Sequence, residues 1–154
     1  MSHLLDGPWE AAFYTELPAK LRSKSNYRRG KKGWGALATF EAVTAATLAN
    51  ARPADWNLGD KSKPVNERPT VVLAVIATSL IDSTNFTKSV ADAMEGVLVH
   101  NDASVATSMT LSERSKSNQR CAVAVAQLPA KASLAEQAKA VGELAAQLPA
   151  LFNQ

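Results

Sequence analysis

Acidic, amide and basic side chains recur at short intervals in the middle of the chain. Asp82 comes directly after an apolar run, Asn85 and Lys88 follow it, and Asp102 lies further along. A carboxylate at the end of a strand, an amide and a lysine on the following helix, and a carboxylate before the next strand can converge on one point. Carboxylate and water oxygens are the ligands that Mg²⁺ prefers. The spacing therefore predicts a divalent-cation site, with Lys88 supplying further positive charge.

Two elements have to position these residues. Residues 70–78 form a continuous β-branched and apolar run, which is typical of a strand at the centre of a sheet or covered on both faces. Ser83 or Thr84 can cap a helix that runs through Met94 and ends at Gly96, where a residue without Cβ can take a left-handed turn. We therefore expect a strand followed by a helix around Asp82.

The remaining elements are predicted from the spacing of apolar residues and from the positions of prolines. Residues 9–17 indicate a strand that ends at a proline, and 36–51 a helix with apolar residues near helical spacing. Residues 53–69 contain three prolines and indicate a long surface loop. Two alternating segments, 105–111 and 121–128, predict strands joined as a hairpin through 112–119.

The C-terminal segment has a clear helix signature. Ser133 and Glu136 form a capping-box pattern, and apolar residues follow at helical spacing up to Pro149. With the other elements, this helix predicts an α+β fold in which a single-domain mixed β-sheet carries helices packed mainly on one face. The domain spans residues 1–154, with a basic loop at 20–35 and the C-terminal helix at 133–152.

Composition limits the class of protein. A chain of 154 residues, of which 46% are hydrophobic, can bury one core. Cys121 is the only cysteine, which excludes an intrachain disulfide and a Cys-rich zinc site, and it lies in an apolar strand as a core residue. The longest strongly apolar run, 71–77, is much shorter than a membrane span, and the N-terminus lacks the order of a signal peptide. We therefore expect a cytoplasmic protein with no membrane segment.

Basic residues are concentrated in one stretch that contains no acid. The proposed DNA-binding residues are seven basic side chains, one amide and one aromatic: Lys20, Arg22, Lys24, Arg28, Arg29, Lys31 and Lys32, with Asn26 and Tyr27. Three glycines between 30 and 35 favour an exposed, flexible loop, and Tyr27 and Trp34 can stack on bases. Such a run can also be a solvated surface, but together with the acidic site it predicts contact with DNA.

The central segment resembles the RusA family of Holliday junction resolvases. The family signature reads Asp-x-Asp-Asn-x-x-Lys, then Asp-Ala-Leu, a Gly-containing turn and a paired Asp-Asp before a strand. Its first acid, amide and lysine fall on Asp82, Asn85 and Lys88, its Asp-Ala-Leu on residues 92–94, and the second acid of its pair on Asp102. Weaker similarity extends the match to roughly residues 13–128, with the C-terminal helix as an addition.

The resemblance implies a RusA-like fold and Mg²⁺-dependent hydrolysis of DNA phosphodiesters, with Mn²⁺ as a possible substitute. Asp82 and Asp102 would hold the metal, and Lys88 would stabilise charge on the phosphate or leaving oxygen. These three residues are the expected catalytic set. The substrate implied is branched DNA, a four-way junction, and its two-fold symmetry implies a homodimer that makes paired nicks in recombination and repair.

Two positions depart from the signature. Thr84 stands at its second acid and Asn101 at the first acid of the later pair, so these two residues, with Asn85, are assigned supporting roles. Neither side chain brings a negative charge to a cation. The alternative is therefore a catalytically impaired protein that binds junctions or branched DNA, and a third possibility is an unrelated α+β protein with a chance match.

Two nearby titratable residues have simpler interpretations. Asp92 lies four residues after Lys88 and can form an ion pair with it on the same helix, so Asp92 is interpreted as structural. His100 is a lone histidine in a turn and is interpreted as incidental to metal binding.

Overall fold

The computed structural model describes residues 2–18, 31–80 and 83–154, with backbone alone at 2, 31–37 and 83–85. Strands and helices are interspersed along this part of the chain. In order, its elements are β1 (Ser2–Leu4), β2 (Ala11–Leu17), α1 (Lys31–Ala51), the 3-10 turn η1 (Val65–Glu67), β3 (Thr70–Thr78), α2 (Ser83–Ala93), the 3-10 turn η2 (Asp102–Ser104), β4 (Val105–Glu113), β5 (Arg120–Leu128) and α3 (Leu134–Phe152).

The strands form one mixed sheet in the order β1-β2-β5-β3-β4. β3 runs parallel to β4 and antiparallel to β5, and β5 runs antiparallel to β2. A parallel pair needs a crossover connection, and α2 lies within the connection from β3 to β4. The predicted α+β fold with a mixed sheet is therefore confirmed.

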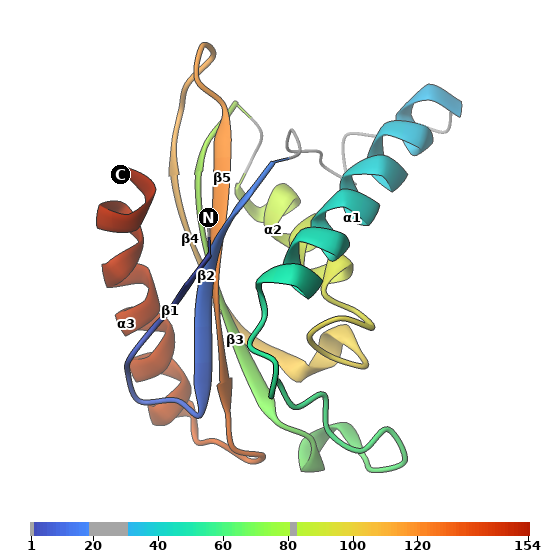
Figure 1. Ribbon diagram of the computed structural model, residues 1–154, viewed down its shortest axis with the longest axis vertical. Coiled ribbons are helices and arrows are strands. Elements are labelled where there is room, and N and C mark those ends of the chain that lie inside the picture. The colour runs from blue at the N-terminus through green and yellow to red at the C-terminus, as the bar shows by residue number, and fades with distance from the viewer. Residues whose placement is uncertain (1, 19–30, 81–82) are drawn as a thin grey trace.

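Helices cover both faces of the sheet, as Figure 1 shows, with α1 and α2 on one side and α3 on the other. Alternate residues of β3 enter two separate cores: Leu73 and Val75 pack with α1 and α2, whereas Val72 and Ala74 pack with α3. This explains the unbroken apolar run of 70–78, because neither face of the strand meets water. Two of the three described helices thus share one face, as expected.

The predicted hairpin between the last two strands is wrong. β4 and β5 both form, but β3 lies between them. β5 is buried along almost its whole length, so it takes an interior position, whereas the polar β4 suits an edge. The connection crosses the end of β3, where Thr78 Oγ1 donates to the Asn118 carbonyl and accepts from the Arg120 N–H at 3.1 Å.

Two further boundaries differ from expectation. α1 begins at Lys31 rather than Ala36, so residues 31–35 of the predicted basic loop are helical. Glycine disfavours helix, but extending a formed helix by a turn costs far less than nucleating one. β1 was not predicted, since three residues carry no readable period. It forms by pairing with β2, with His3 opposite Tyr14.

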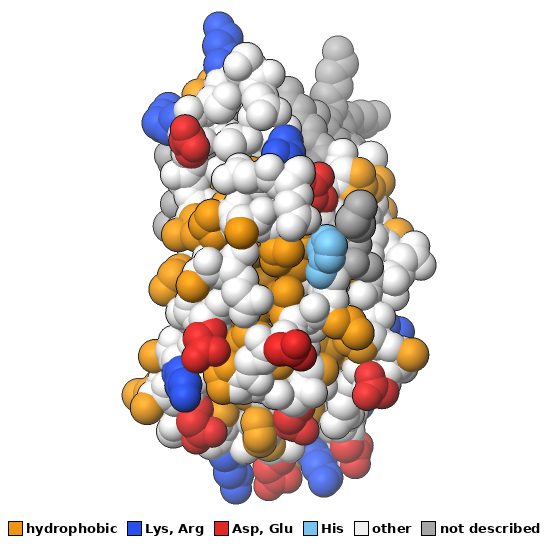
Figure 2. All heavy atoms as spheres, turned by 60° about the vertical axis from the view of Figure 1, so that its left-hand side comes forward, with side chains coloured by type: hydrophobic (Ala, Val, Ile, Leu, Met, Phe, Trp, Pro, Cys, Tyr) orange, Lys and Arg blue, Asp and Glu red, His pale blue; other side chains and the backbone are white. Residues whose placement is uncertain are grey.

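The C-terminal helix forms as the capping box predicts. Ser133 Oγ accepts from the Glu136 N–H at 3.1 Å, and the Glu136 carboxylate accepts from the Ser133 N–H at 3.2 Å. Cys121 is buried in the core, as expected. Among the described residues, no helix has the length and apolar character needed to cross a membrane. Charges of both signs are mixed over the lower part of the face in Figure 2, so that region carries no block of one sign.

Candidate active site

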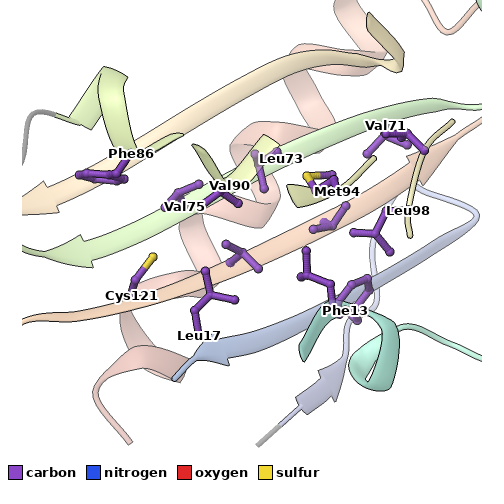
Figure 3. Packing of buried hydrophobic residues seen from close by; sticks show 14 of the residues in the cluster. Phe13, Leu17, Val71, Leu73, Val75, Phe86, Val90, Met94, Leu98 and Cys121 are labelled. Carbon is purple, nitrogen blue, oxygen red and sulfur yellow. The ribbon is translucent and has the colours of Figure 1, made fainter. Parts of the chain in front are cut away.

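Helix α2 is fixed to the sheet by one apolar face. Phe86, Val90 and Met94 recur at intervals of one helical turn and are fully buried. Figure 3 shows them in the same cluster as Leu73 and Val75 of β3. The residues that follow each anchor by one and two positions project to the side of this face, which directs Thr87, Lys88, Ala91 and Asp92 toward a neighbouring pocket.

The opposite wall of this pocket depends on an irregularity in β4. Val71 pairs with Val105 but Val72 pairs with Thr107, so the register shifts by one residue between them. Side chains alternate between the faces of a sheet, and a shift of one residue reverses the face that each later residue takes. The shift therefore places Ser108 and Thr110, rather than their neighbours, on the side of α2.

The pocket between α2 and β4 has a volume of about 550 Å³. It gathers residues from four separate elements. Its polar lining consists of two acids, one ammonium group and three hydroxyls, from Asp92, Asp102, Lys88, Thr87, Ser108 and Thr110, and its apolar lining consists of Leu73, Ala91 and Val105. The structure thus brings Lys88 and Asp102, predicted from spacing, to one pocket. A hydroxyl contact joins its walls, with Thr87 Oγ1 and Thr110 Oγ1 2.6 Å apart.

Asp102 enters this pocket from a 3-10 turn with side-chain caps. Asn101 Oδ1 accepts from the Ala103 N–H at 2.9 Å and so caps η2. The Glu95 carboxylate accepts from the Asp102 N–H at 3.1 Å. Asn101 is exposed and does not line the pocket, so its observed role is to shape the turn.

The chain before this turn is held by the end of α1 and the loop after it. Arg52 donates to the Val97 carbonyl, and Trp56 Nε1 donates to the Leu98 carbonyl at 2.9 Å. His100 Nε2 lies 3.1 Å from the Gly59 carbonyl oxygen. These contacts fix the approach of the chain to Asp102.

Several predicted site residues lie wholly or partly outside the described part of the chain. Asp82 lies outside the described residues, and Thr84 and Asn85 are described only as backbone in the first turn of α2. Lys31 and Lys32 begin α1, again without described side chains. The other predicted DNA-binding residues also lie outside the described part: Lys20, Arg22, Lys24, Asn26, Tyr27, Arg28 and Arg29.

The described carboxylates that line this pocket are those of Asp92 and Asp102. Within residues 2–18, 31–80 and 83–154, no group of three His, Cys, Asp or Glu side chains could hold an ion. Asp102 supplies a carboxylate at the pocket, and the segment 81–82 with Asp82 directly precedes α2. Carboxylate oxygens are the donors that a hard cation prefers, and Asp82 would add a third carboxylate to those of Asp92 and Asp102.

Sequence reasoning missed the hydroxyl-bearing wall. Ser108 and Thr110 alternate along β4 and could have been recognised as one face of a strand, but the side of the sheet that they occupy depends on the register shift. The left-handed turn expected at Gly96 is present, with a φ of +79°. Glu95 was missed, because its contact with the Asp102 N–H depends on how the chain folds back after this turn.

The chain was compared with models of known protein families, and one of them matches the segment that contains this pocket. Residues 18–126 match the family model described as endodeoxyribonuclease RusA. The matched segment includes every residue that lines the pocket, whereas β2 and α3 lie outside it. No curated protein matches the chain.

Proposed function

This chain belongs to the RusA family of Holliday junction resolvases, and on that premise we propose that it nicks four-way DNA junctions in a Mg²⁺-dependent hydrolysis. The observation that carries the proposal is the pocket between α2 and β4. It joins an ammonium group and a carboxylate, at Lys88 and Asp102, inside the segment that matches the family.

The proposed metal ligands are Asp82 and Asp102. Both are carboxylates, which suit Mg²⁺ and also Mn²⁺. The chemistry that the bound ion supplies is polarisation of the phosphate and a lowered pKa of the attacking water. Asp102 lies on a capped turn, so its backbone is fixed before substrate arrives. Thr84 and Asn85, in the first turn of α2, would support this site.

Lys88 is proposed to stabilise negative charge on the scissile phosphate or the leaving oxygen. Its side chain is exposed and lines the pocket, so the ammonium group is accessible to a phosphate of bound DNA. A positioned positive charge of this kind contributes most where charge develops in the transition state.

Binding of the DNA backbone is assigned to the basic stretch from Lys20 to Lys32. Seven positive charges without an acid would release counterions from DNA and give binding that weakens steeply with salt. The two-fold symmetry of a four-way junction favours a homodimer, which would place one pocket on each of two opposed strands.

The test uses a labelled synthetic four-way junction with Mg²⁺. We expect paired nicks that disappear in Asp82→Asn and Asp102→Asn, and a rate about 10²–10³-fold lower in Lys88→Ala. Matched controls are Asp6→Asn and Lys139→Ala, which alter exposed residues away from the pocket and should cleave normally. Absence of nicks with the unaltered chain at any divalent metal would contradict the proposal.

A second candidate is a junction-binding protein with impaired cleavage. It is favoured by the neutral residues Thr84 and Asn101 at two positions where the family signature has acids. This candidate predicts salt-sensitive junction binding that survives Asp82→Asn, with no nicks. Cleavage that appears only in Thr84→Asp, with Thr84→Asn as the neutral control, would favour it over the first.

A further inference from the structure

The Asp102 turn is tied to α2 by a single described side chain outside the pocket. Glu95 lies just after the end of α2, and its carboxylate oxygen Oε1 accepts the Asp102 N–H at 3.1 Å. The bond links the helix that carries Lys88 to the turn that carries Asp102, and both of these residues line the pocket. Glu95 is itself exposed and is not among the lining residues.

The turn between the two residues is tight, which makes this contact possible. Gly96 has a φ of +79°, and its N–H donates to the Val99 carbonyl at 2.7 Å. Glu95 and Val99 form an isolated bridge, so the chain returns toward the end of α2 before it reaches Asp102. A left-handed conformation at this point favours glycine, and the local fold therefore presents Glu95 to the following turn.

The remaining anchors of this segment stop short of Asp102. The Arg52 and Trp56 side chains hold the carbonyls of Val97 and Leu98, and His100 contacts the carbonyl of Gly59. Asn101 closes η2 internally through the Ala103 N–H. The Glu95 carboxylate, in contrast, connects the Asp102 backbone to the end of α2.

We propose that Glu95 is a positioning residue for Asp102, acting by holding the Asp102 N–H so that the Asp102 carboxylate keeps a fixed place beside Lys88. This inference rests on the proposed function, because it concerns the same pocket. A carboxylate that binds a cation must be held within a fraction of an ångström of its productive place, and residues behind the ligand supply that constraint.

The test compares Glu95→Ala with Glu95→Gln. A glutamine keeps an oxygen that can accept the Asp102 N–H, whereas alanine removes the acceptor. In amide hydrogen exchange followed by NMR, we expect the Asp102 N–H to exchange about 10-fold faster in Glu95→Ala and within about 2-fold of the unaltered chain in Glu95→Gln. Glu10→Ala, which alters an exposed acid before β2, is the matched control and should change nothing.

A second readout follows the metal without requiring cleavage. Titration with Mn²⁺, detected by broadening of the Asp102 amide resonance, should need about 5–10-fold more ion in Glu95→Ala, with Glu95→Gln close to the unaltered chain. The Mg²⁺ concentration for half-maximal nicking should rise in parallel, while junction affinity measured without metal stays constant.

The outcomes separate this inference from the proposed function. Unchanged Asp102 exchange in Glu95→Ala, or a Glu95→Gln variant as impaired as Glu95→Ala, would overturn the positioning role, the latter because charge rather than the hydrogen bond would then matter. An unaltered chain that binds Mn²⁺ with the expected Glu95 dependence but makes no nicks would instead overturn the nuclease proposal and leave the positioning role supported. Failure of the unaltered chain to bind Mn²⁺ would overturn the metal-dependent nuclease proposal, and the Asp102 exchange rates would then decide the positioning role on their own.

Discussion

Thr87 and Thr110 join helix α2 to the edge strand β4, with their hydroxyl oxygens 2.6 Å apart at the pocket. Both side chains are partly buried, and β4 has only β3 as a neighbour in the sheet. The hydroxyl pair therefore helps to set the width of the pocket, since it connects the wall that carries Lys88 to the wall that carries Ser108.

Replacement of Thr110 by valine keeps the shape of the side chain and removes the hydroxyl. We expect the free energy of unfolding to fall by about 1 kcal/mol, the ordinary net value of one hydrogen bond. Chemical denaturation measures this change. Ser112→Ala, at the next position on the same face but exposed, should alter stability by less than about 0.5 kcal/mol. Equal effects of the two substitutions would contradict a role for the hydroxyl pair.

Arg120 attaches the end of α3 to the sheet. It pairs with Glu16 of β2, donates to the Phe152 carbonyl at 2.9 Å and lies 4.2 Å from the centroid of the Phe152 ring. Arg120→Ala should therefore lower the free energy of unfolding by about 1–3 kcal/mol. Glu16→Gln should cost less than about 1 kcal/mol, because both partners of the ion pair are substantially exposed, at 33% and 43%. A larger loss in Glu16→Gln than in Arg120→Ala, measured by thermal denaturation, would contradict this ranking.

Stability should decline at alkaline pH. Burial raises the pKa of Tyr14 to about 12, and the charge of Glu16 adds to this effect. Burial also raises the pKa of the Cys121 thiol. In the unfolded chain these groups lose their protons near pH 10 and pH 8.5, so above those values the unfolded state binds fewer protons and the free energy of unfolding falls. Neither group contributes a slope below about pH 8.

Tyr14→Phe isolates the phenol in this decline. Denaturation curves recorded from pH 7 to 12 should show a shallower fall between about pH 10 and 12 than the unaltered chain shows. At pH 7 little stability should be lost, because the buried Tyr14 hydroxyl has no hydrogen-bond partner among the described residues. Cys121→Ala is the companion variant and should remove the earlier part of the fall. An alkaline slope that is identical in Tyr14→Phe would disprove the assignment.

The elements that could be predicted from the sequence are those in which local signals agree with the tertiary environment. β3 spans the predicted residues because β-branched side chains suit a strand buried on both faces. The cap of α3 at Ser133 is a local hydrogen-bond pattern and was readable in the same way. The strand that pairs with β4 could not be predicted from the sequence, because pairing depends on which strand lies at the centre of the sheet. The burial of β3 and β5 decides that position.

The candidate site was predictable only as far as helical and strand spacing reach. Lys88 and Asp102 could be assigned to one site from a motif, and the structure places both at one pocket. The contribution of Ser108 depends on a one-residue shift in the pairing of β4, and that of Glu95 on a left-handed turn at Gly96. The turn at Gly96 was expected from the residue type, but the register of β4 and the contact that the Glu95 carboxylate makes with the Asp102 N–H are set by contacts between segments and leave no pattern in the residue types.

Asn101 offers a test of whether added negative charge strengthens the site without damage to the fold. Its side chain accepts the Ala103 N–H at 2.9 Å, and an aspartate can accept the same bond. We therefore expect Asn101→Asp to keep the free energy of unfolding within about 0.5 kcal/mol, whereas Asn101→Ala should lose about 1 kcal/mol through the missing cap. The extra charge beside Asp102 should lower the Mg²⁺ concentration for half-maximal nicking several-fold, because a carboxylate attracts the cation and an amide does not. A metal requirement that is unchanged in Asn101→Asp, with stability intact, would show that this position acts only through the turn.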